Sequence, residues 1–297
     1  MTPFFLIDNF INYLETEKRF SDHTVVAYKK DIEQFISFSE IKTAKEIEEI
    51  KSSLVRSWMV DLYDLKITKK SINRKLSSLR NFFKWLVKED IISSNPMSKL
   101  QGVKSEKRLP SFAKPSEMSI EKLDDFFSDD FEGVRNKLIV EMFYQTGIRL
   151  SELIDLKTIN VNSESIKVLG KRNKERIIPI SKKIFSLISE YKTLKNKTVS
   201  ECECFFVLKN GKKLYPKLVY RIINIYLGYV TNLDKCSPHV LRHTFATHML
   251  NNGAGLETLK DLLGHANLSA TQVYTHNSFT QLTNIYSQAH PRGHKKK

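Results

Sequence analysis

Apolar residues recur at helical spacing through the first third of the chain. Four segments show this period, each with charged or polar residues on its opposite face. The pair Asn95 and Pro96 ends the last segment, because a residue that precedes proline disfavours helical backbone angles. The pattern predicts an all-helical domain over residues 1–96. Its expected buried positions are Leu6, Phe10 and Tyr13; Val25, Tyr28, Ile32 and Phe35; Val55, Trp58, Met59 and Leu62; and Ile72, Leu76, Leu79, Phe83 and Leu86.

The helical period is lost over residues 97–116. This stretch holds four lysines, one arginine, two prolines and a single glutamate. Such a composition is typical of a basic interdomain linker. It fits a plain tether and a segment that runs over DNA equally well.

Residues 117–297 combine helical patterns with strand signals. A strong helix over 133–145 buries Leu138, Met142 and Phe143 and ends at Gly147. Residues 164–180 predict a β-hairpin that turns at 170–173, and an Asn-Gly pair at 210–211 signals a second hairpin. Helices are expected near 217–229 and after Ser237. The predicted fold is mainly α with a small β component, an all-α domain followed by an α/β domain.

Charge narrows the choice of partner. The chain of 297 residues carries a formal net charge of +15, which favours a polyanion, although a merely basic protein has the same composition. No apolar run is long enough to span a bilayer, and no signal segment opens the chain. The three cysteines are too few and too scattered for a disulfide framework. We therefore expect a cytoplasmic protein.

Two arginines are candidates for binding an anion. Arg149 begins the predicted helix RLSELIDL, where the helix dipole favours an anion rather than a cation, so a ligand explains it better than helix stability does. The alternative is a surface arginine paired with Glu152. Arg242 shares a helix face with His239, three residues before it. Two guanidinium forks suit the nonbridging oxygens of a phosphodiester in its transition state.

Tyr274 is the candidate nucleophile for such a phosphodiester. Its phenol has an ordinary pKa of ~10 and needs a proton acceptor, for which His239 is suitably placed. His265 can donate a hydrogen bond, and Lys171 at the hairpin tip can protonate the leaving 5′ oxygen. A covalent phosphotyrosine conserves the bond energy, so rejoining needs no ATP. This chemistry suits strand exchange or a topoisomerase rather than simple hydrolysis.

Motifs for metals and nucleotide cofactors are weak or missing. His239 and His243 have zinc-ligand spacing, but the glutamate of the H-E-x-x-H motif is absent. Cys202 and Cys204 have no second pair. The sequence contains neither a P-loop nor a dinucleotide fingerprint. We expect no metal and no cofactor.

Five cations are candidates for DNA binding. Lys70, Arg74 and Lys84 lie on one face of the fourth predicted helix, and Arg172 and Lys174 lie at the hairpin tip. Long donors on a helix suit a phosphate backbone or a major groove. A solvated helix face is the alternative, and for the helix considered alone it is the better one.

Four boxes of sequence together resemble the tyrosine recombinases, or phage integrase family, and most closely their bacterial Xer type. They are TGIRLSEL (146–153), VLGKRNKERIIPI (168–180), HVLRHTFATHML (239–250) and LLGHANLSATQVYTH (262–276). The segments SDHTVVAYKKDIEQF and INRKLSSLRNFFKWL resemble the family's SAM-like core-binding domain. The likeness covers nearly the whole chain.

The resemblance implies roles for six residues. They are Arg149, Lys171, His239, Arg242 and His265 in catalysis, with Tyr274 as the nucleophile. It also implies a C-shaped DNA clamp and a homo- or hetero-tetramer with a second Xer-type recombinase. In that assembly, a C-terminal helix over 277–290 docks on a neighbouring subunit. The extra arm-binding domain of many phage integrases is expected to be absent.

The resemblance implies chromosome-dimer resolution at a terminus-region site during cell division, activated by a septal DNA translocase. The alternatives are a mobile-element integrase with the same chemistry and a type IB topoisomerase. A DNA-binding protein without catalysis is a further alternative from another class.

Overall fold

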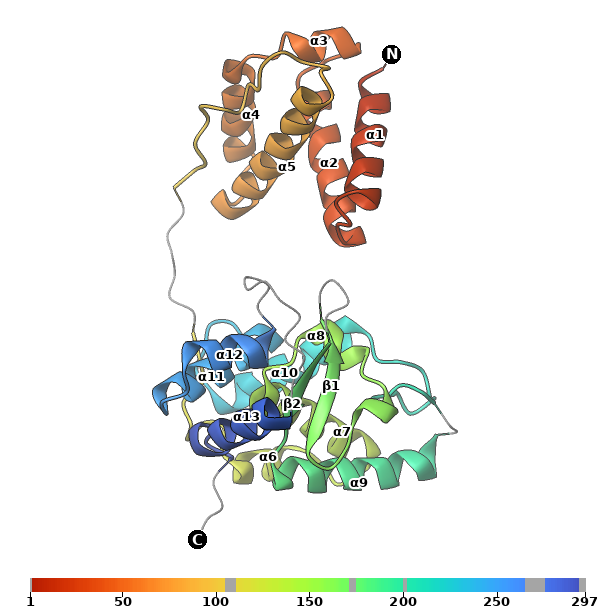
Figure 1. The fold of residues 1–297 in the computed structure, drawn as a ribbon, viewed down its shortest axis with the longest axis vertical. Coiled ribbons are helices and arrows are strands. Elements are labelled where there is room, and N and C mark those ends of the chain that lie inside the picture. The colour runs from red at the N-terminus through yellow and green to blue at the C-terminus, as the bar shows by residue number, and fades with distance from the viewer. Residues whose placement is uncertain (1, 105–110, 171–174, 200–201, 265–275, 294–297) are drawn as a thin grey trace. The chain divides into compact units, whose positions relative to one another are not determined.

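The computed structural model describes residues 2–104, 111–170, 175–199, 202–264 and 276–293. The chain forms two compact units, Met1–Arg108 and Leu109–Lys297, drawn in Figure 1. Helices dominate both units, and the described residues contain one two-stranded sheet. The predicted fold class, mainly α with a small β component, is confirmed. No helix in these ranges is both long and apolar enough to cross a bilayer.

The first unit is all-helical, as its apolar period predicts. The buried positions named above lie in its core, except that Tyr13, Tyr28 and Met59 are half-buried at its edge. A short helix, α3, was not predicted, because its five residues bury only Ile47 and show no period. The helices are α1 (Pro3–Thr16), α2 (Asp22–Phe38), α3 (Ala44–Glu48), α4 (Ser52–Asp64) and α5 (Lys69–Lys88).

Both ends of the predicted linker segment are ordered against their neighbouring units. Met97 and Leu100 are buried in the first unit, and Val103 exchanges two hydrogen bonds of 2.8 Å with the Asn73 side chain. At the other end, the Ala113 backbone N–H donates to Thr244 Oγ1 over 3.0 Å. The residues between them, 105–110, lie outside the described ranges.

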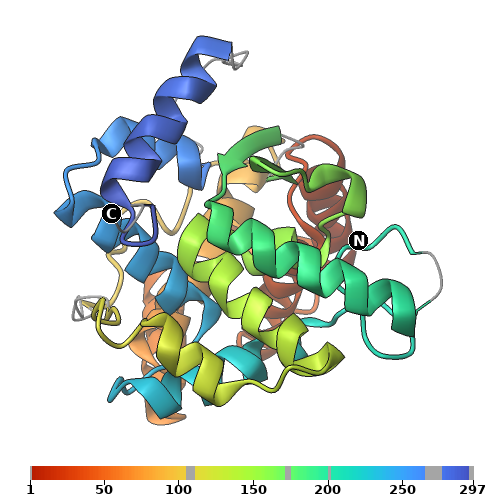
Figure 2. The same cartoon turned by 90° about the horizontal axis from the view of Figure 1, so that it is seen from below.

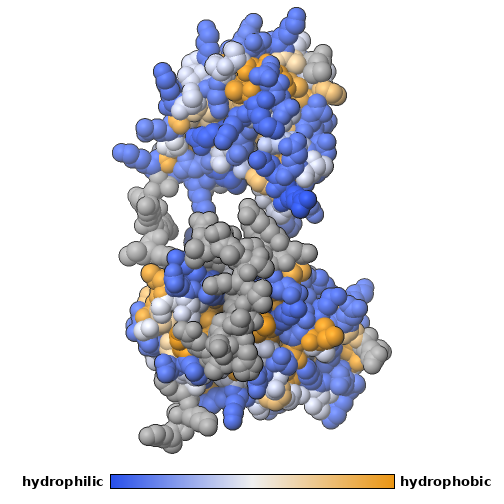
Figure 3. Space-filling model, viewed as in Figure 1, coloured by the Kyte–Doolittle hydropathy of each residue, from blue (hydrophilic) through white to orange (hydrophobic). Residues whose placement is uncertain are grey.

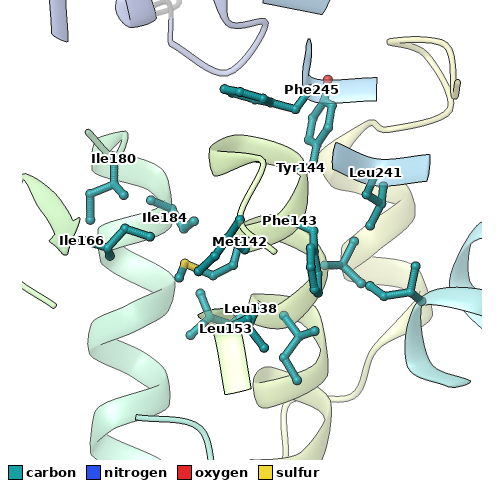
Figure 4. Packing of buried hydrophobic residues seen from close by; sticks show 14 of the residues in the cluster. Leu138, Met142, Phe143, Tyr144, Leu153, Ile166, Ile180, Ile184, Leu241 and Phe245 are labelled. Carbon is teal, nitrogen blue, oxygen red and sulfur yellow. The ribbon is translucent and has the colours of Figure 1, made fainter. Parts of the chain in front are cut away.

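The second unit is built around one helix, α7 (Phe131–Thr146), which is buried on almost every side. Such a helix must be covered by other elements all round. Figure 2 shows α9 (Lys182–Thr198) alongside it. Figure 4 shows Met142 directed toward Ile166 and Ile184, while Phe143 lies on the side of Leu241. The remaining helices are α6 (Ile120–Phe126), α8 (Leu150–Ile154), the 3-10 turn η1 (Thr158–Asn160), α10 (Pro216–Val230), α11 (Pro238–Asn251), α12 (Leu256–Leu263) and α13 (His276–Ala289).

The predicted hairpin of residues 164–180 is confirmed. Strand β1 (Ser165–Leu169) pairs antiparallel with β2 (Glu175–Pro179), so that Ile166 faces Ile178 and Val168 faces Arg176. The predicted second hairpin is reduced to a turn with one isolated bridge, between Val207 and Lys213. It makes no strand pair because Phe205, Phe206 and Val207 are all buried and do not alternate between core and solvent.

The C-terminal helix α13 packs on its own unit. Leu282 and Tyr286 are buried, and His290 stacks on Tyr286 with ring centroids 5.2 Å apart. His290 Nε2 donates to the Tyr144 carbonyl over 3.1 Å, and burial lowers the pKa of His290 to about 3. The expected helix is therefore present, while its docking on a neighbouring subunit stays a prediction.

Candidate active site

Three arginines from three elements meet at the end of α12. Arg176 Nε donates to the Leu262 carbonyl over 2.8 Å, Arg242 Nη2 to Leu263 over 2.7 Å, and Arg149 Nη2 to Gly264 over 2.8 Å. The last carbonyls of a helix have no donors within the helix, and its negative end attracts cations. Three consecutive carbonyls are thus satisfied by three guanidinium groups.

A glycine turn brings two of these arginines together. Gly147 ends α7 with a left-handed φ of 58°, two residues before Arg149. A Cβ atom there would lie 2.6 Å from Phe245 and 2.8 Å from Leu263, so no larger residue fits. Arg242 Nη1 donates to the Gly147 carbonyl. The turn therefore links the end of α7, the start of α8 and the face of α11 that carries Arg242.

Glu152 joins Arg149 to Arg176. Glu152 Oε1 accepts from Nη1 of Arg149 and from Nη1 of Arg176, each over 2.7 Å. Its Oε2 accepts from Arg176 Nη2 and from the Arg149 backbone N–H, each over 2.8 Å. The pair of Arg149 and Glu152 that the sequence offered as an alternative does form. It is not a surface pair, because the Glu152 side chain is only 2% exposed.

Positive charge exceeds negative charge in this cluster of Arg149, Arg176, Arg242 and Glu152. Burial alone would raise the pKa of Glu152, but the bonds and charges of Arg176 and Arg149 outweigh it and lower the pKa to about 2. Burial, together with the charges of Arg149 and Arg176, lowers the pKa of Arg242 to about 9. Glu152 and Arg242 are therefore both ionised at neutral pH. Three cations face one carboxylate, and this excess of positive charge suits a bound anion.

His239 lies in the first turn of α11, exposed and one turn before Arg242, so both project from the same face. The other histidines of that helix point elsewhere. His243 packs edge-on against Phe112, and His248 is buried between the Tyr144 hydroxyl at 3.1 Å and the Ala113 carbonyl at 2.9 Å. No group of three potential metal ligands occurs among the residues that the structure describes.

Lys171, His265 and Tyr274 lie outside the described residues, as do Arg172 and Lys174. The chain itself still ties two of them to described elements. Lys171 comes two residues after the end of β1, and His265 directly follows Gly264, whose carbonyl accepts from Arg149.

The predicted DNA-binding residues of the first unit share α5. Lys70, Arg74 and Lys84 are all exposed. Arg74 is also bonded through both terminal nitrogens to Asp31, with Nη2 at 2.8 Å from Oδ1. Asp31 is buried and also accepts from Lys75 Nζ at 3.1 Å. Figure 3 shows hydrophilic side chains over most of the visible surface of this unit.

Sequence reasoning missed Arg176 as a member of the site. A usable signal was present. Arg176 stands two and four residues before Ile178 and Ile180, so it shares their face of the strand, which is the buried one. An arginine on such a face requires a buried anionic partner. The identity of that partner, Glu152, required the structure.

Two family models match the chain. The "Phage integrase family" matches residues 116–281, and the "Phage integrase, N-terminal SAM-like domain" matches residues 7–90. The chain is 37% identical to tyrosine recombinase XerC of Anoxybacillus flavithermus, over 97% of this chain and 98% of the relative. It is also 37% identical to XerC of Staphylococcus epidermidis, with the same coverage.

Solved structures share the fold. XerH site-specific recombinase, bound to a palindromic difH substrate after cleavage, matches with a TM-score of 0.70 and 21% identity, over 89% of this chain and 79% of that one. The Tn1549 transposon integrase, in complex with circular intermediate DNA, matches with a TM-score of 0.70 and 19% identity, over 95% and 98% of the two chains.

Proposed function

Because the chain belongs to the phage integrase family and is a tyrosine site-specific DNA recombinase, we propose that it cuts and rejoins DNA through a 3′-phosphotyrosine on Tyr274. The family resemblance inferred from the four sequence boxes is thereby confirmed. The roles of the individual residues are proposals.

One observation carries the proposal: Arg149 and Arg242 converge on the end of α12, where they donate to the carbonyls of Gly264 and Leu263. His265 directly follows Gly264 in the chain. Both guanidinium groups keep N–H donors that the α12 carbonyls do not use. Those donors bind the nonbridging oxygens of the scissile phosphate and stabilise the charge that develops on them. His265 adds a third hydrogen bond.

The proposed reaction is a transesterification. The phenol oxygen of Tyr274 forms a bond to phosphorus while the bond from phosphorus to the 5′ oxygen breaks. His239 takes the phenol proton, and Lys171 gives a proton to the departing 5′ oxygen. The reverse attack by a 5′ hydroxyl rejoins the strand. The cluster supplies positive charge from arginines, so the step uses neither a metal ion nor ATP.

Duplex DNA is the proposed substrate. The net charge of +15 favours it, and the two solved relatives named above hold DNA. Lys70, Arg74 and Lys84 on α5 bind the phosphate backbone, together with Arg172 and Lys174 of the second unit.

The biological role that we propose is resolution of chromosome dimers at a terminus-region site during cell division. Relatives named XerC, at 35–37% identity over nearly the full chain, support it. The working assembly is a tetramer, of this chain alone or with a second Xer-type recombinase, activated by a septal DNA translocase.

A nicked suicide substrate tests the chemistry. The full chain is incubated, in the presence of a chelator, with a nicked duplex that bears the terminus-region site, and the products are separated on a denaturing gel. We expect a slowly migrating protein–DNA adduct, which is absent for Tyr274→Phe while that variant binds the duplex within a few-fold of wild type. An equal adduct yield from Tyr274→Phe would exclude this tyrosine as the nucleophile.

Two further substrates test the role. A second Xer-type recombinase is added to the cleavage reactions, but not to the relaxation reaction, so that a missing partner is not mistaken for a wrong site. Cleavage of mobile-element ends in preference to the terminus-region site would indicate an integrase. Relaxation of supercoiled DNA of random sequence by the chain alone would indicate a topoisomerase.

A further inference from the structure

Arg176 lies beside the proposed catalytic groups but is shielded from any substrate. Its side chain is only 5% exposed, whereas that of Arg149 is 29% exposed. Three of its donors are already used, two by the carboxylate of Glu152 and one by the Leu262 carbonyl. Arg176 therefore acts on its neighbours rather than on a phosphate.

The first of these neighbours is Glu152, which also binds Arg149. The carboxylate carries one negative charge and accepts bonds from both arginines. With Arg176 present, one guanidinium charge neutralises the carboxylate and the charge of Arg149 remains available to an anion. Without Arg176, the buried carboxylate would have Arg149 as its remaining cationic partner and would draw that charge away from the phosphate.

The second neighbour is the end of α12. Arg176 holds the first of the three carbonyls that the arginines share, and the other two are held by Arg242 and Arg149. Gly264, the C-cap of this helix, is followed in the chain by His265. A displacement of the helix end would move two proposed phosphate ligands together with the chain that leads into the histidine.

We infer that Arg176 is a positioning residue for strand cleavage: it neutralises Glu152, so that Arg149 keeps its charge for the scissile phosphate, and it fixes the end of α12. The inference rests on the proposed function of Arg149 and Arg242. It concerns the rate of cleavage after DNA is bound, because Arg176 does not reach the solvent side of the site.

The test compares single-turnover cleavage of the nicked substrate, at saturating protein, with separately measured DNA affinity. Arg176→Met removes the charge and all three bonds. We expect its cleavage rate to fall by about 10- to 100-fold, the usual effect of displacing reactive groups by about 1 Å, with DNA affinity within about threefold of wild type. Arg176→Lys keeps the charge but not the fork, so its rate should fall between the two.

A second substitution separates positioning from loss of structure. Glu152→Gln removes the carboxylate that Arg176 neutralises, so the double variant Arg176→Met with Glu152→Gln should cleave faster than Arg176→Met alone. The rate is normalised to the fraction of folded protein, because removing a buried carboxylate that has lost Arg176 can also restore stability; a defect in folding alone predicts equal normalised rates for the single and the double variant.

Arg135 provides a matched control within the same unit. It is 2% exposed and bonded to Asn136 and to the Val207 carbonyl, but it lies in the first turns of α7, roughly 18 Å along that helix from the Gly147 turn. Arg135→Met should lower the thermal midpoint while the cleavage rate of the folded protein stays unchanged.

The inference would be overturned if Arg176→Met cleaved DNA at the wild-type rate, or if the double variant cleaved no faster than Arg176→Met. If Arg176→Met does not fold, Arg176→Lys decides by the same comparison with wild type. Absence of a Tyr274-dependent adduct from the wild-type chain, with a second Xer-type recombinase present, would instead overturn the proposed function, so the two failures are distinguishable.

Discussion

The described residues of each unit include a buried carboxylate that binds two cations, and the two arrangements differ in how firmly the cations are held. Around Asp31 the side chains of Arg74 and Lys75 are 46% and 11% exposed. Around Glu152 those of Arg149 and Arg176 are 29% and 5% exposed. The carboxylates themselves are equally buried, at 2%.

The further partners of each cluster account for this difference. Asp31 has one more, the hydroxyl of Ser78 at 2.8 Å. Among the described residues, the guanidinium group of Arg74 bonds to this carboxylate alone. In the second unit, Arg149 and Arg176 each donate as well to a carbonyl at the end of α12. Binding a DNA backbone tolerates small shifts of a cation, whereas phosphoryl transfer depends strongly on the position of its ligands. The more constrained cluster is the one assigned to chemistry.

Replacement of Arg149 or Arg74, the more exposed cation of each cluster, by lysine should distinguish the two clusters most sharply. Arg149→Lys loses the bidentate fork, and we expect cleavage to fall by at least about 100-fold, as for loss of one donor to a transition-state oxyanion. Arg74→Lys, the control, should leave the cleavage rate of bound DNA unchanged. The measurement is single-turnover adduct formation at saturating protein. Near-normal cleavage by Arg149→Lys would show that Arg149 is not a ligand of the scissile phosphate.

Acid should weaken the second unit through Glu152. Its pKa is about 2 in the folded protein against 4.5 for the free group, so the folded state binds the proton more weakly than the unfolded chain does. The resulting stabilisation, roughly 3 kcal/mol, is complete above about pH 5 and is lost as pH falls toward 2.

Chemical denaturation of wild type and Glu152→Gln between pH 7 and 3 measures this effect. His290 also makes the protein less stable as pH falls below about 6.5, because its pKa is lowered to about 3 in the folded state and the unfolded chain binds the proton first. Only the difference between the two proteins therefore reports on Glu152. The difference should shrink as the solution becomes more acidic. A constant difference would show that the charge of Glu152 contributes nothing.

The salt dependence of DNA binding should show the smallest effect, and it should distinguish paired from unpaired cations on α5. Lys70→Ala should lower the slope of log affinity against log salt by about one unit, as expected for one lost phosphate contact. Arg74→Ala should lower it by less, because Asp31 already compensates part of that charge. Equal slopes for both variants and wild type would show that this face of α5 is an ordinary solvated surface that does not contact DNA phosphates.

Local pattern alone predicted much of this molecule. The apolar period placed the four long helices of the first unit, because burying one face of a helix requires that spacing. Alternation placed the two strands of the hairpin. Arg149 was singled out because a cation at a helix N-terminus conflicts with the dipole, a conflict visible within a few residues.

Tertiary structure decided what these residues contact. Arg149 meets Gly264 across 115 positions, and Arg176 meets Leu262 across 86, separations over which no periodicity carries information. Burial of α7 on nearly every side likewise depends on elements that follow it in the chain. The sequence by itself therefore determined the four long helices of the first unit, the first hairpin and the candidacy of Arg149 and Arg242. Only packing brought three arginines to one helix end, because carbonyls left unpaired there and a shared buried carboxylate both require partners from elsewhere in the fold.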